Sequence, residues 1–486
     1  MSPAGAAAAP IAGHGGEDDG FMVGVAISVF QNSGDNGSNW TRYQSQRLCC
    51  CIPTIAGGHK AEDGPDFWNN YQDDIKLAAS LGSNCFRFSL EWARLEPRRG
   101  EYDAAAWEHY DGIVQCIKDH GMHPHATLHH YVHPTWFEDL GAFEKEQNIA
   151  IYVEFARECF RRWGNQIRYW TTFNEITVYI VAGYLSTQFP PGKLFRFRKA
   201  GQVYANMLTA HTRAYRAIKE LPGGGKSRIG IVHNWFGFVP KGKGPGYAAA
   251  RGLASWMNTV WGNEAVLEYF KTGVWRWSAK LPFTRVHRDE GERPGLDFFG
   301  LNFYSRGVVS WACAPTHMDD EPMTDMPYGV WEGGLLKTLR HISSRLPGTP
   351  IQITESGVAD KADKLRGPWI ESHFAQVAQA LDEGIDVRSF LYWTLMDNFE
   401  WHEGFFMKFG LHRFDPGQKT RDFPLKDGAK PILEWFARLK GRRPQLAPEA
   451  RSAREVEPEV GAAEGARLRQ RTTTDRDAPA VALAGQ

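Results

Sequence analysis

The stretch QIRYWTTFNE, residues 166–175, is an aromatic and β-branched run that ends in an amide and a carboxylate, Asn174 and Glu175. This composition is typical of a buried strand, whereas a terminal carboxylate is a group that a core excludes. Seven further stretches repeat the short apolar pattern. The eight runs are FMVGVAISVF (21–30), CFRFSLEW (85–92), HPHATLHH (123–130), QIRYWTTFNE (166–175), RIGIVHNWFGF (228–238), LDFFGLNFY (296–304), PIQITESG (350–357) and VRSFLYWTLMDNF (387–399).

Segments with helical spacing lie between these runs. DDIKLAASLG (73–82), YDGIVQCIKDHG (110–121) and VAQALDEG (377–384) precede the second, third and eighth runs, and each closes with Gly. Eight strands alternating with helices predict an α/β fold, a parallel (β/α)8 TIM barrel that forms a single catalytic domain. A doubly wound open sheet is the alternative, but no Gly-rich phosphate turn follows the first run. The long intervals after the first, fourth and fifth runs predict loops and extra helices at one face.

The two ends of the chain differ from the middle. Residues 1–20 have neither the basic region nor the apolar region of a secretory signal, and they are predicted to be a disordered leader. Residues 443–486 alternate charges with Ala and Pro and contain almost no aromatic anchors, which predicts a disordered tail. The barrel domain is therefore assigned to residues 21–442.

Charge and cysteine content narrow the function classes. Lys plus Arg and Asp plus Glu each total 56 in 486 residues, so no net field favours nucleic acid or an anionic membrane, and a neutral small molecule is the simpler partner. The sequence contains no run of about 18 apolar residues, so no transmembrane segment is predicted. Seven cysteines, with Cys49, Cys50 and Cys51 consecutive, cannot all pair within the chain, which predicts a reducing, cytoplasmic location. The cysteine run is assigned to a plain loop, and a monomer and a homo-oligomer both stay open.

Polar residues mark the ends of several predicted strands, where the chemistry of such a barrel lies. Arg87, Ser89 and Glu91 alternate along the second run and so share one face. The other polar ends are His129 and His130, Asn174 and Glu175, Asn302 and Tyr304, Glu355, and the group Asp397, Asn398, Glu400 and Trp401. Glu175 and Glu355 stand on different sides of the ring and can face each other across a ligand. Two such carboxylates are what hydrolysis of a glycosidic bond needs.

Four motifs resemble those of glycoside hydrolase family 1: FRFSLEWARLEP (86–97), TFNE (172–175), ITESG (353–357) and YWTLMDNFEW (392–401). The resemblance covers about residues 21–440. It implies a retaining β-glycosidase of the β-glucosidase or β-galactosidase type, acting on a small β-glycoside without cofactor or metal. It also implies that Glu175 is the acid/base and Glu355 the nucleophile, which forms a covalent glycosyl-enzyme intermediate.

The residues around the two glutamates are consistent with that division. Arg87 is a permanent cation in an apolar strand and needs a buried anion; Glu355 is the expected partner, and the pair would keep Glu355 ionised. A structural bridge from Arg87 to Glu91 is the alternative. Tyr304 is expected to donate to Glu355. Glu175 must instead carry a proton when substrate arrives and release it once Glu355 is esterified.

The resemblance also implies a sugar pocket. Asn174 would bind the sugar 2-hydroxyl, and Asn302 joins Arg87, Asn174 and Tyr304 as catalytic support. The implied substrate-binding residues are Gln31, His130 and Trp401 for the ring hydroxyls, Glu400 for O4 and O6, Trp393 as a stacking floor and Phe409 on the O6 side. Because a carboxylate repels phosphate, Glu400 predicts an unphosphorylated sugar. The chain departs from the family at Tyr131, Ile176 and Ser356, where Trp, Pro and Asn are usual.

Three alternatives remain beside this hypothesis. A transglycosidase of the same fold would pass the sugar to a sugar or lipid acceptor instead of water. A non-catalytic carbohydrate-binding protein would be expected to lack one of the glutamates. The histidines His123, His125, His129, His130 and His133 also permit a zinc site, but a strand running into a turn is not expected to place His129 and His133 on one face, and no metal site is predicted.

Overall fold

The computed structural model describes residues 20–442 except 36, 49–50, 280–283, 290–293, 313–314 and 419. The predicted leader, apart from Gly20, and the predicted tail lie outside the described residues, as do Cys49 and Cys50. No helix in the described part of the chain is long and apolar enough to cross a membrane.

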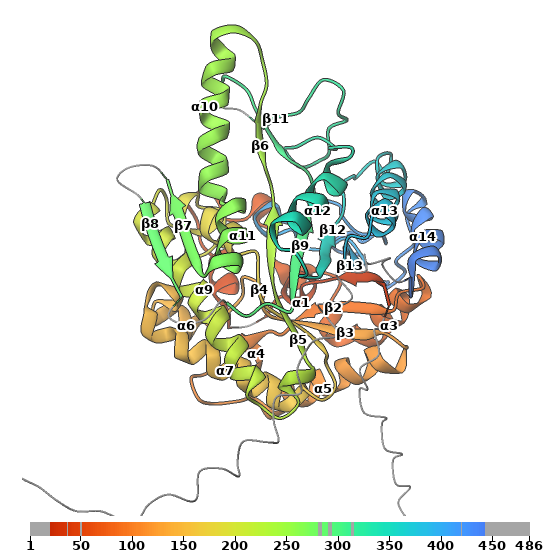
Figure 1. Ribbon diagram of the computed structural model, residues 1–486. Coiled ribbons are helices and arrows are strands. Elements are labelled where there is room, and N and C mark those ends of the chain that lie inside the picture. Colours follow the sequence, from red (N-terminus) through yellow and green to blue (C-terminus); the bar gives the residue numbers. More distant parts are fainter. Residues whose placement is uncertain are drawn as a thin grey trace, which may run out of the picture. The chain divides into compact units, whose positions relative to one another are not determined.

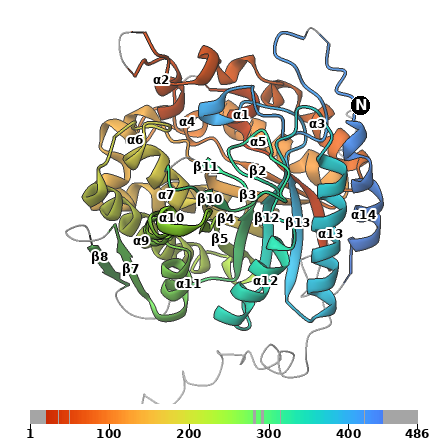
Figure 2. The same cartoon turned by 90° about the horizontal axis from the view of Figure 1, so that it is seen from above.

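Within the described residues, eight strands close into a barrel in the order β1-β13-β12-β9-β5-β4-β3-β2, and all neighbours are parallel (Figures 1 and 2). The strands are β1 (Met22–Ala26), β2 (Cys85–Ser89), β3 (His123–His129), β4 (Tyr169–Asn174), β5 (Arg228–Trp235), β9 (Phe298–Phe303), β12 (Ile351–Ser356) and β13 (Val387–Trp393). Each lies inside one of the eight predicted runs. The (β/α)8 barrel is therefore confirmed, and the open sheet is wrong because the ring leaves no edge.

Helices surround this ring (Figure 2). The longer ones are α3 (Phe67–Ser80), α5 (Ala104–Asp119), α7 (Ile149–Trp163), α9 (Phe197–Lys219), α11 (Asn263–Thr272), α12 (Gly334–Arg345), α13 (Arg366–Asp382) and α14 (Pro431–Leu439). The glycines that were expected to close three of them, Gly82, Gly121 and Gly384, have φ of 86°, 70° and 79°. These left-handed conformations end a helix at no steric cost only where the residue lacks a Cβ.

Extra elements occupy the long intervals after β1, β4 and β5, as predicted, and also follow β2, β3, β9 and β13. The short helices are α1 (Val29–Ser33), α2 (Asn39–Gln44), α4 (Trp92–Leu95), α6 (Thr135–Asp139) and α8 (Ile176–Ile180), with a π-helix at Val181–Leu185 and 3-10 turns at Ala56–Gly58, Ala61–Asp63, Ala142–Glu144, Glu146–Asn148, Gly224–Lys226, Trp401–Glu403 and Asp427–Ala429. The longer helix α10 (Gly244–Trp261) extends away from the barrel strands beside β6 (Phe238–Pro240) (Figure 1).

Four short strands complete the fold. They are β7 (Val274–Ser278), β8 (Thr284–Arg288), β10 (Gly307–Val309) and β11 (Pro315–Thr316). Strands β7 and β8 form an antiparallel pair, whereas β6, β10 and β11 form a small separate sheet. This sheet joins the segments that follow β5 and β9, so two of the long connections are fixed to each other above neighbouring barrel strands.

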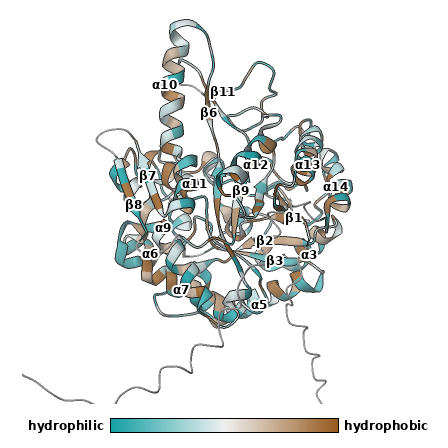
Figure 3. Cartoon of the chain, viewed as in Figure 1, coloured by the Kyte–Doolittle hydropathy of each residue, from teal (hydrophilic) through white to brown (hydrophobic). Residues whose placement is uncertain are grey.

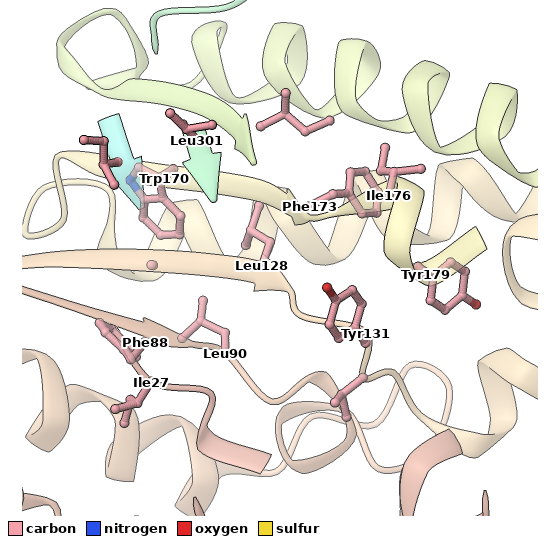
Figure 4. Packing of buried hydrophobic residues seen from close by; sticks show 14 of the residues in the cluster. Ile27, Phe88, Leu90, Leu128, Tyr131, Trp170, Phe173, Ile176, Tyr179 and Leu301 are labelled. Carbon is pink, nitrogen blue, oxygen red and sulfur yellow. The ribbon is translucent and has the colours of Figure 1, made fainter. Parts of the chain in front are cut away.

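Side chains of the barrel strands form part of the hydrophobic core. Figure 3 shows apolar colour along the strands and hydrophilic colour on many outer helix surfaces. Phe88, Leu128, Phe173 and Leu301, which come from β2, β3, β4 and β9, are fully buried, and Figure 4 shows them among the packed side chains. Burying a side chain of this kind contributes about 1.5–3 kcal/mol. This packing holds the strand ends, and the polar residues on them, in fixed positions.

Candidate active site

A cavity of about 320 Å³ lies at the carboxyl ends of the barrel strands. It brings together residues that are far apart in the sequence, including the ends of β4 and β12. The predicted site residues that line it are His130, Asn174, Glu175, Tyr304, Glu355, Trp393, Glu400, Trp401 and Phe409. This volume is within the range of small-molecule sites.

Glu355, near the end of β12, is bound by a cation and a phenol. The Arg87 guanidinium donates to Oε1 at 2.5 Å, and the Tyr304 hydroxyl donates to Oε2 at 2.7 Å. Arg87 and Glu355 are both buried. The Arg87–Glu355 pair is thus the one that the sequence predicted. The alternative bridge to Glu91 is wrong, since Glu91 accepts a hydrogen bond from Ser89 at 2.6 Å instead.

Opposing effects act on the ionisation of Glu355. Burial raises the pKa of this carboxyl above its ordinary value, and the nearby Glu175 adds to the rise. The charge of Arg87 and the hydrogen bond from Tyr304 lower it. The prediction that Arg87 keeps Glu355 ionised considered only the second pair of effects. Arg87 therefore offsets a burial cost rather than producing an unusually acidic group.

Glu175 follows β4 and precedes α8, with a left-handed backbone at φ 43°. Non-glycine residues rarely adopt this conformation outside functional turns. Its Oε1 accepts from the Asn234 amide at 2.9 Å and from the Asn302 amide at 2.7 Å. The Tyr131 hydroxyl donates to its Oε2. All three donors are neutral, in contrast to the guanidinium on Glu355.

A hydrogen-bond network joins the two carboxylates. Arg87 donates to Asn174 Oδ1 at 2.8 Å, and Asn302 donates to the same oxygen at 3.2 Å. The Asn174 amide is 3.1 Å from His130 Nε2. Burial lowers the pKa of His130 well below its ordinary value, and the neighbouring Arg87 lowers it further. A neutral His130 can accept the Asn174 hydrogen bond, which fixes the amide orientation.

Glu400, one of the predicted sugar-binding residues, lines the cavity together with the two catalytic candidates. Burial raises the pKa of Glu400 to about 8, with a contribution from the charge of Glu355. Gln31 lies beside Glu400, and its amide donates to Phe399 O at 2.9 Å and to Glu400 at 3.3 Å. Trp401 has φ 45° and stacks on Phe30, with ring centroids 6.0 Å apart. Gln31 supports Glu400 and is not one of the residues that line the cavity.

A glycine explains how two parts of this site come close. A Cβ on Gly357 would stand 2.0 Å from the backbone oxygen of Trp393. Only glycine permits this approach between the ends of β12 and β13. The approach places Glu355 and Trp393 on the same rim of the barrel.

Residues 17–440 match the model of glycosyl hydrolase family 1. The chain belongs to this family. It is 28% identical over 481 residues to Beta-glucosidase 30 of Arabidopsis thaliana, covering 87% of this chain and 81% of that one. It is 27% identical to a 6-phospho-beta-galactosidase of Streptococcus equi subsp. zooepidemicus, covering 87% and 97%. A beta-glycosidase from Pyrococcus horikoshii shares the fold with a TM-score of 0.72 at 30% identity, covering 90% and 98%. The resemblance drawn from four motifs is confirmed, and the protein is a β-glycosidase of family 1.

One prediction about this family 1 chain was wrong. The rings of His129 and His133 do share a face: His129 Nε2 is 3.1 Å from His133 Nδ1, and the rings are stacked at 18°. The chain turns back directly after β3, which brings the rings together. His133 Nε2 in turn lies 2.7 Å from Glu138 Oε2. Among the residues that the structure describes, no group of three or more His, Cys, Asp or Glu side chains could hold a metal ion.

Sequence reasoning missed part of this family 1 site. Asn234 lies at the end of β5, inside the fifth predicted run, so a search for polar residues near strand ends would have found it as well. Tyr131 had been noted only as a departure from the family, without its bond to Glu175. Trp261 gave no signal, because its position depends on how the chain after β5 folds back.

Proposed function

We propose that this protein hydrolyses O-linked β-glycosides of unphosphorylated sugars with retention of configuration, through a covalent glycosyl-Glu355 intermediate. The unequal surroundings of the two carboxylates support the proposal. Glu355 is bound to Arg87, which favours the ionised form that a nucleophile needs. The donors to Glu175 that the structure describes, Asn234, Asn302 and Tyr131, are neutral, and in the mechanism Glu175 must lose and regain a proton in each cycle.

The reaction proceeds in two steps. Glu355 attacks C1 while Glu175 gives its proton to the glycosidic oxygen, so the bond from C1 to that oxygen breaks and the alcohol leaves. Glu175 then takes a proton from water, which attacks C1 and releases Glu355. Arg87 and Tyr304 hold the nucleophile during both steps. Asn174 binds the sugar 2-hydroxyl, and Asn302 holds the Glu175 carboxyl group in position. The proposed sugar-binding residues are Gln31, His130, Trp393, Glu400, Trp401 and Phe409.

The charges around the cavity support an unphosphorylated sugar. Glu175, Glu355, Glu400 and Glu403 line the cavity, and no Lys or Arg is among its described lining residues. A 6-phosphate would enter without a cationic partner among these residues, and burying an unpaired charge costs several kcal/mol. We expect kcat/KM for 4-nitrophenyl β-glucoside to exceed that for its 6-phosphate by at least about 100-fold. Preference for the phosphorylated sugar would contradict this part of the proposal.

Trapping the intermediate tests the mechanism. A 2-deoxy-2-fluoro β-glucoside with a good leaving group should inactivate the protein and add one fluoroglucosyl group to the peptide that carries Glu355. Peptide mass spectrometry locates the adduct, and Glu355→Gln should prevent it. An adduct on another residue, or steady release of sugar without an adduct, would disprove the assigned nucleophile.

Hydrolysis and transfer share the first step, so product analysis must separate them. The protein is incubated with a chromogenic β-glycoside and increasing concentrations of an alcohol, sugar or glycolipid acceptor. A hydrolase releases one free sugar for each chromophore in the absence of acceptor. Transfer products with little free sugar would favour the transglycosidase alternative.

We further propose that residues 21–442 form the catalytic domain. A truncated chain of those residues should then retain full kcat/KM.

A further inference from the structure

The part of the cavity beside Glu175 is lined by apolar side chains. Val178 follows Glu175 by one turn in α8, and Ala182 lies in the π-helix that continues it. Phe236 and Trp261 line the cavity from the segment between β5 and α11. Because an acid group gives its proton to the leaving oxygen, the side chains around it are those that the leaving group contacts.

Three aromatic rings form one wall of this region. The Phe236 ring centroid is 5.6 Å from that of Trp261 and 5.6 Å from that of Tyr328, which also lines the cavity. Trp261 Nε1 donates to the backbone oxygen of Asn234 at 3.0 Å, so the polar atom of the indole is already bonded within the protein. The Asn263 amide likewise donates to the backbone oxygen of Phe236 at 3.3 Å. The wall therefore presents mainly carbon surface.

Two polar groups near this wall already have partners within the protein. The Asn234 amide donates to Glu175, and the Gln188 side-chain oxygen accepts from Ser186 at 3.1 Å. Any hydroxyl of a second sugar that exchanged water for this carbon surface without gaining a new hydrogen bond would make binding less favourable. An apolar group gains free energy from the same transfer.

We propose that the leaving group of the natural substrate is an apolar alcohol, aryl or alkyl, rather than a second sugar. This inference rests on the proposed hydrolase function, because it requires Glu175 to face the leaving oxygen. Flat rings of the leaving group can pack against Phe236, Trp261 and Tyr328, and alkyl chains can cover the same surface.

A series of alkyl β-glucosides from methyl to hexyl tests the proposal. The alkyl leaving groups are chemically alike and differ in apolar area. Each methylene buried against the wall should raise kcat/KM by up to about fourfold, and we expect at least a 30-fold rise from methyl to hexyl. A flat series, or a larger kcat/KM for cellobiose than for hexyl β-glucoside, would overturn the proposal. The inhibition constants of the matching alkyl β-thioglucosides should fall in the same order, and this readout does not depend on turnover.

Two neighbouring positions provide a variant and its control. Phe236 lines the cavity, whereas Trp235 lines a separate cleft on the other face of the segment. Phe236→Gln should reduce the hexyl-to-methyl ratio of kcat/KM by about tenfold, since it places an amide in the wall. Trp235→Gln should keep the wild-type ratio. Equal ratios in the two variants would overturn the assignment of the wall.

The failure of this inference is distinguishable from that of the proposed function. A 2-fluoroglucosyl adduct on Glu355 together with a flat alkyl series would refute only the apolar leaving group. Absence of the adduct, with no hydrolysis of an aryl β-glycoside, would refute the proposed function, whatever the thioglucoside constants show.

Discussion

Two carboxylates in one cavity have different surroundings. Glu355 is bound by the guanidinium of Arg87 and the phenol of Tyr304, whereas Glu175 is bound by two amides and the phenol of Tyr131. Among the described residues, a buried cation donates to only one of the two carboxylates, Glu355. Chemically identical side chains can thus be given different roles by the charge of the donors around them.

The largest effect on activity is expected from removing Glu355, the carboxylate that is bound to Arg87. Glu355→Ala should lower kcat by about 10⁴-fold or more, because no covalent intermediate forms. Added azide should restore some turnover by attacking C1 from the vacated side, and the product should be the α-glycosyl azide. Nuclear magnetic resonance of the product gives its configuration. A β-glycosyl azide would reverse the proposed assignment.

Glu175→Ala should have a smaller effect that depends on the leaving group. General acid catalysis contributes about 10²–10⁴-fold, so a poor leaving group such as an alkyl alcohol should show a loss in that range. The first step with 2,4-dinitrophenol as leaving group needs little protonation and should be far less affected. Azide should here give the β-glycosyl azide, since it attacks the intermediate. Equal losses for both leaving groups would contradict an acid role.

Removing Arg87 should make the surroundings of Glu355 more like those of Glu175. Arg87→Met leaves Glu355 without its charge partner, and kcat/KM should fall by about 100-fold. Because the Arg87 charge lowers the pKa of Glu355, its loss should move the acidic limb of the kcat/KM profile to higher pH. Arg421→Met is the matched control, since it removes the cation from buried Asp74 away from the cavity. The control should lose stability but keep the acidic limb in place.

Glu400 should make stability depend on pH. Its pKa is raised from 4.5 to about 8 by burial, so between these values the folded chain holds a proton that the unfolded chain releases. The free energy of unfolding should therefore fall as pH rises through this window, by up to about 1.4 kcal/mol per pH unit from this group. Glu400→Gln should make the dependence less steep. Urea unfolding of both proteins from pH 5 to 8 measures it, and identical slopes would contradict the prediction.

The smallest effect is expected at Tyr131. Tyr131→Phe removes one of three donors to Glu175 and leaves the Asn234 and Asn302 amides in place. It should lower kcat/KM for an alkyl β-glucoside, which needs the acid group, by less than about tenfold, since one hydrogen bond contributes about 0.5–1.5 kcal/mol. A 2,4-dinitrophenyl β-glucoside should be almost unaffected. Tyr304→Phe acts on the other carboxylate and should lower kcat/KM for both substrates alike. Equal losses for the two substrates in Tyr131→Phe would show that its hydroxyl does not act on Glu175.

The sequence predicted the barrel and both glutamates for the same reason. A fully buried strand is a continuous apolar run, and a polar residue at its end must have a partner or a ligand, so Glu175 and Glu355 stood out. Contacts that depend on local reversal of the chain could not be predicted. Tyr131 and Trp401 have φ of 66° and 45°, conformations that these residue types avoid and that only surrounding tertiary contacts impose.

The aromatic wall could not be predicted from the sequence for a different reason. Phe236 lies in the fifth predicted run but beyond the end of β5, and Trp261 is the last residue of α10, so no periodic pattern indicated that the two rings contact each other. The pairing of His129 with His133 belongs to the same class of contact. Sequence patterns report the period of regular elements and say little about side chains on irregular connections.

The bond from Arg87 to Glu355 spans 268 residues of chain. Arg87 and Glu175 belong to the first half of the barrel, while Glu355 and Trp393 arrive with β12 and β13, and β13 closes the ring by pairing with β1. A nascent chain must therefore be inert until its last strand has emerged and docked. Contacts of such long sequence separation form late in folding. Recovery of activity during refolding should thus report ring closure itself, after most of the helix content has already returned.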